Sequence, residues 1–411
     1  MYHLFSHLDK LWNFHLTVIG VTIKGNMEWN ELNSLHFETG PIRPPSEAYS
    51  LLIRATRNCP WNRCEFCHTY KGQKFELRPV EDVLKDIEKA KKISEGIKEF
   101  ALSSGHAGKD RDMAAYIYNQ VSANECVRQV ALWQYAGGTS AFLQDANSII
   151  MRTPDLVRVV AALKETFPGI DRITSYCRSK TAAKKTLEEL KQVHEAGLTR
   201  IHMGMESGCD AVLQLTSKGM TAEDHIKGGQ NVKEAGIELS EYYMPGLGGR
   251  KLWQEHSAES ARVLNAVNPD FIRLRTLMMS EMLEMWKRVE SGEFEMMSED
   301  ETVREIGDFI SRLEFSGELK SDHILNLLPE LEGKFPEARK TCLDTVNRYL
   351  SMPLKERLNF RLGRRAGIYE RLNDLYDADK YQRVDEAMRK VGADTTEKVD
   401  ELIEGIKQRF I

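Results

Sequence analysis

The feature that most constrains the fold is a regular alternation of helix-like and strand-like segments through the middle of the chain. Each helix-like segment carries an apolar stripe at helical spacing, ends near Gly or Asn, and is followed at once by a short apolar run. Gly and Asn are typical of helix C-termini, and a short apolar run after them predicts a buried strand. Four strands are predicted in this way, 172–177, 200–205, 238–244 and 271–277, and the apolar run 51–56 and the segment 139–143 bring the number to six.

Alternation of this kind implies a parallel sheet with helices outside it, either as an open sheet or as a barrel. Residues 97–138 break the rhythm with helix-like patches and four glycines, which indicates an insertion before the second strand. Beyond Met278 the sequence is rich in Glu, Lys, Arg and Leu and has no strand-like run. We therefore expect an N-terminal extension (1–48), an α/β domain (49–278) and a helical C-terminal region (279–411).

Three cysteines follow the first predicted strand within nine residues. Cys59, Cys64 and Cys67 are spaced C-x4-C-x2-C. Thiolates at the exit of a strand suit iron–sulfur clusters, zinc or copper(I). Structural zinc sites and typical iron–sulfur clusters take four protein ligands, so three thiolates leave one metal coordination site for another molecule. A site of this composition can bind a substrate or cofactor directly to the metal.

This motif resembles the cysteine loop of the radical S-adenosylmethionine (SAM) enzymes. The resemblance implies that Cys59, Cys64 and Cys67 hold a [4Fe-4S] cluster, that the fourth iron binds the amino and carboxylate groups of SAM, and that Phe66 lies near the adenine. It implies reductive cleavage of SAM to a 5′-deoxyadenosyl radical, which abstracts hydrogen from a substrate. The first gap is one residue longer than the commonest family spacing.

The resemblance also bears on the fold and the branch of the family. It covers the six strand–helix units and favours the (β/α)6 partial TIM barrel of the radical SAM type, followed by a helical C-terminal extension. The downstream pattern most resembles an uncharacterised iron–sulfur oxidoreductase-like branch. In barrels and open sheets alike, ligands gather at the carboxyl ends of the strands, where the cysteine loop is expected.

Two alternatives from other classes stay open at this point. An electron-transfer protein would bind an iron–sulfur cluster without cleaving SAM. A zinc-stabilised binding module would use the three cysteines and His68, although the adjacent Cys67 and His68 rarely reach one tetrahedral ion together. The remaining cysteines stand singly and are predicted to be small buried apolar residues: Cys126, Cys177, Cys209 and Cys342.

The resemblance transfers further SAM-binding roles by position. After the second strand, Asp145 stands where the family has Gly-Gly-Glu and is predicted to bind the SAM amino group. After the fourth strand, Glu206 and Ser207 match the position that holds the ribose hydroxyls. After the fifth, Gly246 and Gly248 lie in a glycine-rich turn that lets the backbone approach the adenine, although such glycines are as often part of a plain tight turn.

Strand alternation predicts which side chains face the interior of the sheet. On the fourth strand His202 and Glu206 should face inward, and on the last strand Arg273 and Arg275 should share one face. A buried guanidinium requires a carboxylate or an anionic ligand. We predict that Arg178 binds the SAM carboxylate and that Arg273 and Arg275 bind a carboxylate or phosphate of the substrate. The alternative is internal ion pairing with acids such as Glu206 and Asp145. No catalytic residue is predicted.

Charge and composition bear on partners and location. The formal net charge of −5 argues against a bulk nucleic-acid binder, so we expect a small-molecule substrate, and the family chemistry implies an electron donor such as ferredoxin or flavodoxin. Seven cysteines without an export signal indicate a reducing cytoplasm, and no membrane partner is expected. The apolar run 16–23 is too short to span a bilayer, and we interpret Met27 as the true start of translation.

The C-terminal region contains a basic run between Lys355 and Arg365. Its cationic residues are Lys355, Arg357, Arg361, Arg364 and Arg365. We interpret this run as a solvated helix face rather than an RNA-binding surface.

Overall fold

The computed structural model describes residues 29–103 and 110–407, and the chain divides into two compact units. Within the described residues the smaller unit comprises 29–36 and 90–137, and the larger comprises 37–89 and 138–407. The apolar run 16–23 and the start at Met27 lie outside the described residues. All the side chains predicted for the functional site belong to the larger unit.

The larger unit is built on one sheet with the strand order β1-β4-β5-β6-β7-β8-β9-β10. Every neighbouring pair from β1 to β9 is parallel, and β10 is antiparallel to β9. Because β1 and β10 remain as edges, the sheet is a partial barrel. The bounds are β1 (Leu51–Arg54), β4 (Ser140–Gln144), β5 (Arg172–Cys177), β6 (Leu198–Glu206), β7 (Glu238–Tyr243), β8 (Phe271–Leu274), β9 (Glu318–Lys320) and β10 (Gly333–Lys334).

The predicted α/β fold is confirmed, and all six predicted strands are present. The expectation that no strand follows Met278 was wrong, because β9 extends the parallel sheet beyond β8 and β10 pairs with it. The sequence of β9 is Glu-Leu-Lys, in which only Leu319 is apolar and fully buried. One apolar residue between two charged ones gives no recognisable strand pattern, and long-range pairing with β8 decides the conformation. The boundary drawn at residue 278 stays a prediction.

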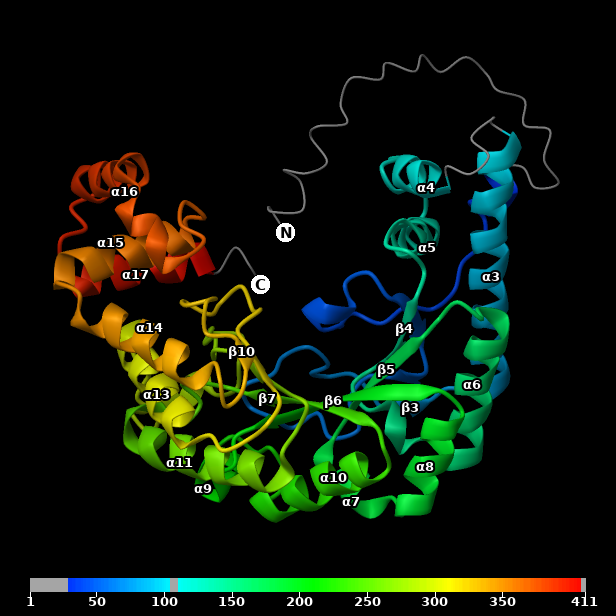
Figure 1. Ribbon diagram of the computed structural model, residues 1–411, viewed down its shortest axis with the longest axis horizontal. Helices are drawn as coiled ribbons and strands as arrows, with labels where there is room; N and C mark the ends of the chain where they lie inside the picture. The colour runs from blue at the N-terminus through cyan, green and yellow to red at the C-terminus, as the bar shows by residue number, and fades with distance from the viewer. Residues whose placement is uncertain (1–28, 104–109, 408–411) are drawn as a thin grey trace. The chain divides into compact units, whose positions relative to one another are not determined.

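Helices cover the outer face of the sheet (Figure 1). Several begin at capping boxes, in which Thr186, Thr221 or Ser298 bonds the backbone three residues on and an acid at that position bonds back. The α-helices of the larger unit after β4 are α6 (Thr153–Thr166), α7 (Ser179–Lys184), α8 (Leu187–Glu195), α9 (Asp210–Leu215), α10 (Ala222–Glu234), α11 (Gly249–Val267), α12 (Trp286–Glu290), α13 (Glu299–Arg312), α14 (Arg339–Ser351), α15 (Leu354–Arg365), α16 (Ala378–Lys390) and α17 (Thr396–Lys407).

The remaining elements are short or lie at the predicted insertion. The insertion is helical, with α4 (Asp110–Tyr118) and α5 (Glu125–Tyr135) in the smaller unit beside α2 (Trp29–Leu32), and α3 (Val80–Ser103) runs from one unit into the other. The described residues also contain the 3-10 helices η3 (Pro45–Glu47), η4 (Ser148–Ile150) and η5 (Leu372–Tyr376). A two-stranded antiparallel sheet pairs β2 (Thr56–Arg57) with β3 (Glu76–Leu77).

The hydrophobic core of the larger unit is continuous from the sheet into the C-terminal helices. One cluster of buried residues includes Met205 on β6, Phe309 on α13 and Ile403 on α17. The C-terminal helices therefore pack on the same core as the strands. None of the helices in residues 29–103 and 110–407 has the length and apolarity that a bilayer crossing requires.

The interpretation of the basic run as a solvated helix face was wrong for two of its residues. Arg361 and Arg365 on α15 are almost fully buried. Arg361 Nε lies 2.9 Å and Arg365 Nη2 lies 2.6 Å from the carboxylate of Glu299 at the start of α13. Lys355, at the other end of the helix, is exposed as expected. A carboxylate far away in sequence thus decides which of these cations is buried.

Candidate functional site

The cysteine loop connects β2 to β3 at the carboxyl end of β1. Two asparagines give it its shape, because Asn58 and Asn62 have positive φ values of 66° and 50°. Asparagine tolerates this left-handed conformation better than most residues. The N–H of Asn62 donates to Cys59 Sγ at 3.4 Å, and its side chain donates to the carbonyl of Gln73 at 3.2 Å. The loop is thus closed by its own hydrogen bonds.

The three thiols lie within electrostatic range of one another. Burial raises the pKa of the Cys64 thiol, Lys218 and Arg178 lower it, and Cys59 and Cys67 raise it further. Cys64 is buried, whereas Cys59 and Cys67 are partly exposed. In the part of the chain that the structure describes, no three His, Cys, Asp or Glu side chains gather closely enough to hold a single metal ion.

This donor set fits a larger group that takes three thiolates. Three thiolates on a cluster carry negative charge, and Lys218 and Arg178 are the cations whose charges reach Cys64. The three-thiol loop leaves one coordination position without a cysteine. The chemistry of the residues therefore suits a [4Fe-4S] cluster with one open iron.

Asp145, which follows β4, holds the start of the cysteine loop. Its Oδ2 accepts hydrogen bonds from Arg54 Nη2 at 2.7 Å and from the N–H of Asn58 at 3.0 Å, and its Oδ1 accepts one from the hydroxyl of Tyr70. Burial raises the pKa of Asp145, while the bonds from Arg54 and Asn58 act in the opposite direction. Internal ion pairing of Asp145, which the sequence analysis gave as the alternative, is thus present, with Arg54 as the cation. As a ligand of the SAM amino group, Asp145 stays a prediction.

Arg178 lies against Trp61 of the cysteine loop. Its guanidinium carbon is 5.3 Å from the centre of the Trp61 ring, and its Nη2 donates to the carbonyl of Lys218 at 2.9 Å. Within residues 29–103 and 110–407 no carboxylate forms an ion pair with Arg178. Its charge is therefore available to an anion, as its predicted role with the SAM carboxylate requires, and that role stays a prediction.

Glu206 and Phe66 are joined by Lys218, a residue that the sequence did not single out. Lys218 Nζ lies 3.3 Å from Glu206 Oε1 and 5.5 Å from the centre of the Phe66 ring. Lys218 sits between α9 and a capped helix with no periodic or motif signal around it. Only the folded chain brings it to the cysteine loop.

Ser207 and the two glycines have partners on the outer helices instead. Ser207 is fully buried, and its Oγ lies 2.8 Å from Nδ1 of His256 on α11. The N–H of Gly246 donates to Glu305 at 2.9 Å, and a Cβ on Gly248 would lie 2.9 Å from that of His256. Close packing thus accounts for Gly248, and a φ of +89° accounts for Gly246. Their predicted roles, and that of Ser207, toward SAM stay predictions.

The inner face of the sheet carries an aromatic and histidine cluster. His202 on β6 stacks on Tyr242 of β7 with ring centroids 5.9 Å apart, and its Nδ1 lies 3.2 Å from the Tyr242 hydroxyl. On its other side, Nε2 lies 3.4 Å from Glu47, and Tyr176 of β5 packs beside it. The predicted inward orientation of His202 is confirmed, because its neighbours are inward-facing residues of adjacent strands.

Arg273 on β8 and Arg275, which directly follows β8, point to the same side, as predicted, and meet at Asp322. Arg275 Nη1 lies 3.1 Å from Asp322 Oδ1, and Arg273 pairs with the other oxygen. Arg275 also lies over the ring of Tyr242, with 4.7 Å between guanidinium carbon and ring centre. The pairing acid was not predicted, because Asp322 follows the unpredicted strand β9. Binding of substrate by these arginines stays a prediction.

Comparison with known proteins adds a family and two relatives. A family model described as the radical SAM superfamily matches residues 53–261. The tRNA uridine(34) acetyltransferase of Methanocaldococcus infernus is 30% identical over 153 residues, which make up 36% of this chain and 26% of that protein. The enzyme of the same name from Methanocaldococcus jannaschii is 24% identical over 289 residues, covering 64% of this chain and 48% of that protein. The chain thus spans less than half the length of either relative.

Among solved structures, the coproporphyrinogen III oxidase of Escherichia coli, described as a radical SAM enzyme, is similar with a TM-score of 0.42 and 12% sequence identity. The similarity covers 74% of this chain and 60% of that one.

Proposed function

Because this chain belongs to the radical SAM superfamily and is an enzyme, we propose that Cys59, Cys64 and Cys67 hold a [4Fe-4S] cluster with which it cleaves SAM. The observation that carries the proposal is the three-thiol loop at the carboxyl end of β1, beside the free charge of Arg178. When bound and reduced, the cluster supplies the electron that breaks a C–S bond of SAM, so that a 5′-deoxyadenosyl radical can take hydrogen from a substrate.

The protein's own residues position the reactants. In this proposal Arg178 binds the SAM carboxylate and Phe66 packs on the adenine. Glu206 accepts a hydrogen bond from a ribose hydroxyl of SAM. Lys218 orients Glu206 through their 3.3 Å ion pair. Asp145 acts indirectly, because it accepts a hydrogen bond from the N–H of Asn58 and so fixes the first residue of the cysteine loop.

The substrate is proposed to be anionic and to reach the inner face of the sheet. Arg273 and Arg275 share the single carboxylate of Asp322, so two cations face one acid there. A carboxylate or phosphate of a substrate would balance the remaining charge. A one-electron donor of the ferredoxin or flavodoxin type, in a reducing cytoplasm, completes the proposed reaction.

A second candidate substrate is RNA. The two relatives are named for an activity on uridine 34 of tRNA, which favours a tRNA uridine over the small molecule that the net charge of −5 suggests. Acetyl transfer is not part of the proposal, because the chain spans less than half of each relative.

The experiment is an anaerobic SAM-cleavage assay. The protein is reconstituted with iron and sulfide, reduced and given SAM, and 5′-deoxyadenosine is followed by mass spectrometry. The control is the triple variant Cys59→Ala, Cys64→Ala, Cys67→Ala. Product that depends on the three thiols is the expected result. A cluster without product would favour electron transfer, and bound zinc without a cluster would favour the zinc-stabilised module.

A further inference from the structure

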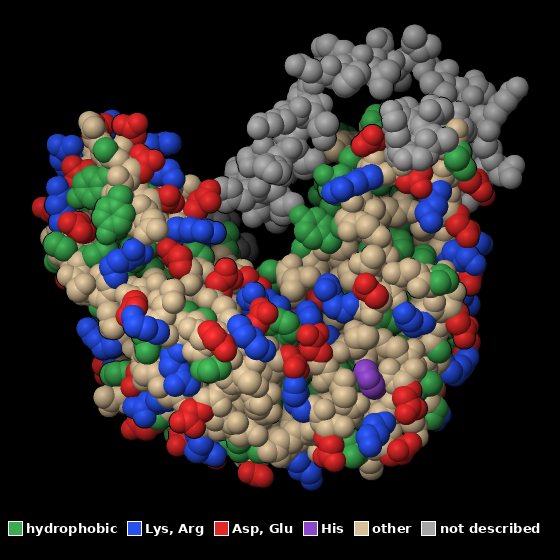
Figure 2. Space-filling view, in the orientation of Figure 1, with side chains coloured by type: hydrophobic (Ala, Val, Ile, Leu, Met, Phe, Trp, Pro, Cys, Tyr) green, Lys and Arg blue, Asp and Glu red, His purple; other side chains and the backbone are tan. Residues whose placement is uncertain are grey.

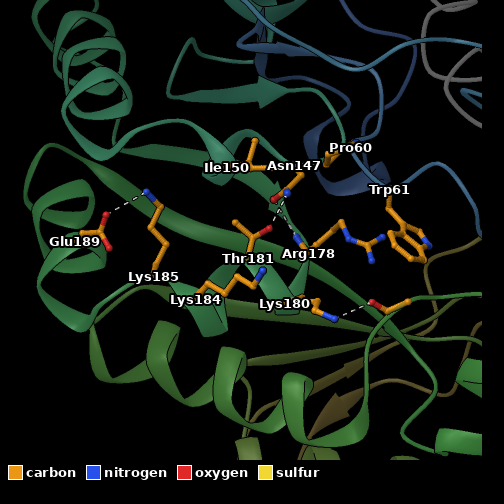
Figure 3. A pocket seen from close by; sticks show the side chains of 11 residues that line it. Pro60, Trp61, Asn147, Ile150, Arg178, Lys180, Thr181, Lys184, Lys185 and Glu189 are labelled. Carbon is orange, nitrogen blue, oxygen red and sulfur yellow. Dashed lines mark hydrogen bonds and ion pairs between the residues drawn. The ribbon is translucent and has the colours of Figure 1, made fainter.

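A cavity of about 510 Å³ opens beside the cysteine loop, within the larger unit (Figure 3). Trp61 of the loop forms one wall, and Asn147, which precedes η4, contributes from the end of β4. The opposite wall comes from α7 and the residues on either side of it, 178–185. Together with Gly219 after β6, segments at the carboxyl ends of neighbouring strands thus border one open space.

The cavity is strongly positive. Its lining contains Arg178, Lys180, Lys184 and Lys185 against a single carboxylate, Glu189. The chain as a whole carries a formal charge of −5, and on the face seen in Figure 2 side chains of both signs are interspersed. A concentration of cations in a concave site raises the local concentration of anions.

One of the four cations is already neutralised. Lys185 Nζ lies 3.5 Å from Glu189 Oε1, 2.7 Å from the hydroxyl of Thr153 and 3.0 Å from the carbonyl of Met151. These three partners occupy the N–H donors of Lys185, and the negative charge of Glu189 cancels the positive charge of Lys185. The excess positive charge of the cavity therefore resides on Arg178, Lys180 and Lys184.

The other two lysines are weakly held. Lys180 Nζ lies 3.5 Å from the carbonyl oxygen of Gly219 and 3.8 Å from Asp224, whose carboxylate also accepts the N–H of Thr221 at the start of α10. Lys184 is exposed at the cavity and forms no hydrogen bond or ion pair with any described residue. The ammonium group of Lys184 is therefore free to bind an incoming anion, and that of Lys180 can exchange its two long contacts for one.

The walls of the cavity are fixed before any ligand arrives. Asn147 is fully buried, donates to the hydroxyl oxygen of Thr181 at 2.8 Å and accepts the N–H of Arg178 at 3.1 Å. The Thr181 hydroxyl accepts from Asn147, which leaves its own O–H to donate into the cavity. Trp61 is held by a 2.8 Å hydrogen bond to the carbonyl of Ser217 and packs flat on Gly219. A preformed site loses little conformational entropy on binding.

We propose that this cavity binds a phosphate group of the substrate through Lys180, Lys184 and the hydroxyl of Thr181. Lysine binds phosphate as a point charge and needs no planar match, which suits two ammonium groups on an open wall. Arg178, at the border with the cysteine loop, keeps its role toward SAM. The phosphate belongs to an RNA strand or to a free nucleotide, which share this chemistry. That the ligand is a substrate rests on the proposed function, because the cavity adjoins the cysteine loop.

The test is a binding measurement on the reconstituted full chain. Fluorescence anisotropy follows a fluorescein-labelled RNA stem–loop carrying an anticodon-arm sequence, with AMP and inorganic phosphate as competitors. The double variant Lys180→Gln, Lys184→Gln is expected to bind the RNA about tenfold more weakly and to reduce the slope of log Kd against log salt by about two. The double variant Lys180→Arg, Lys184→Arg should retain binding.

The matched control is the double variant Lys191→Gln, Lys227→Gln, which removes two exposed lysines of α8 and α10 outside the cavity. Equal weakening in both glutamine variants would overturn the proposal, since only overall charge would then matter. Binding of AMP without RNA binding, measured directly by titration calorimetry and lost in the cavity variant alone, would support the site and identify a nucleotide as its ligand. Binding of none of the three probes would overturn it.

A failure of the proposed function would be seen in a different experiment, the SAM-cleavage assay, as the absence of thiol-dependent 5′-deoxyadenosine. Binding lost only in the cavity variant would support the phosphate site whatever the SAM-cleavage result.

Discussion

Arg54 Nη2 lies 2.7 Å from Asp145 Oδ2, and the same oxygen accepts the N–H of Asn58 at 3.0 Å. Arg54 ends β1, Asp145 directly follows β4, and Asn58 precedes Cys59. Two parallel strands thus fix the first residue of the cysteine loop through one buried carboxylate. The orientation of Cys59 depends on this carboxylate.

Asp145→Asn is expected to destabilise the protein by about 3 kcal/mol, because removing one charge of a buried pair leaves the other incompletely compensated. Iron and sulfide bound after reconstitution should also fall, since the N–H of Asn58 loses a charged acceptor. Urea unfolding and metal analysis measure the two effects. Asp155→Asn, which breaks a pair with the exposed Arg152, is the control and should cost about 0.5 kcal/mol or less. Iron content equal to wild type would remove Asp145 from its positioning role.

The six strands were predictable because their signals are local. A capped helix end followed by an apolar run is complete within some ten residues and precedes β5 to β8, whereas β1 is recognised from its own apolar run and β4 follows two glycines. Strand β9 has only Leu319 as an apolar residue and takes its conformation from pairing with β8. Sequence patterns therefore identified the strands with local signals and missed the one specified by a distant partner.

The residues of the site divide in the same way, into those with a local sequence signal and those whose partners are distant in sequence. Cys59, Cys64 and Cys67 are close in sequence, and the shared face of Arg273 and Arg275 follows from alternation alone. Partner choice was not predictable: Asp322 pairs with both arginines and Lys218 with Glu206, over separations that no local pattern encodes.

Only glycine fits at position 219, because the ring of Trp61, which forms one wall of the cavity, packs against Gly219. Its φ of +71° disfavours other residues, and a Cβ there would overlap the indole. Gly219→Ala is expected to cost about 3 kcal/mol, from the left-handed backbone and from displacement of Trp61. Thermal unfolding measures the loss, and quenching of tryptophan fluorescence by iodide should increase as Trp61 moves.

Gly72→Ala is the matched control for this substitution. Gly72 has a similar φ of +75°, but a Cβ there meets nothing within 4 Å. Gly72→Ala should lower the free energy of unfolding by about 1 kcal/mol, because it carries only the cost of the left-handed backbone. Equal losses in the two variants would show that contact with Trp61 is unimportant.

Glu299 is the acid that Arg361 and Arg365 share, and Arg361 also pairs with Asp400. Arg365 Nη2 lies 2.6 Å and Arg361 Nε 2.9 Å from its oxygens, and the cations hold the pKa of Glu299 far below its usual value despite burial. Glu299→Gln should lower the free energy of unfolding by about 3 kcal/mol, because the buried Arg365 loses its carboxylate partner while Arg361 keeps Asp400. Urea unfolding measures the cost. The control is Glu290→Gln at an exposed position, whose free energy of unfolding should stay within about 0.5 kcal/mol of wild type. A similarly small effect at Glu299 would mean that water reaches the pair.

His202 should make stability depend on pH on the acid side. Burial lowers its pKa to about 4, although the hydrogen bond with Glu47 acts in the opposite direction. The unfolded chain takes up this proton below about pH 6.5 and the folded chain only near pH 4, so stability is lost as pH falls through that window. The loss from this group reaches about 3 kcal/mol.

His202→Asn removes the titrating group from the barrel interior. The variant should be less stable than wild type at pH 7, because it loses the stacking on Tyr242, and the difference should narrow as pH falls from 6.5 to 4. Urea unfolding at a series of pH values measures the difference, with His36→Asn on the exposed surface as the control for loss of a histidine. A constant difference between wild type and His202→Asn across this window would show that His202 is already charged in the folded protein. The stacked pair with Tyr242 would then require Glu47 as a permanent counter-ion.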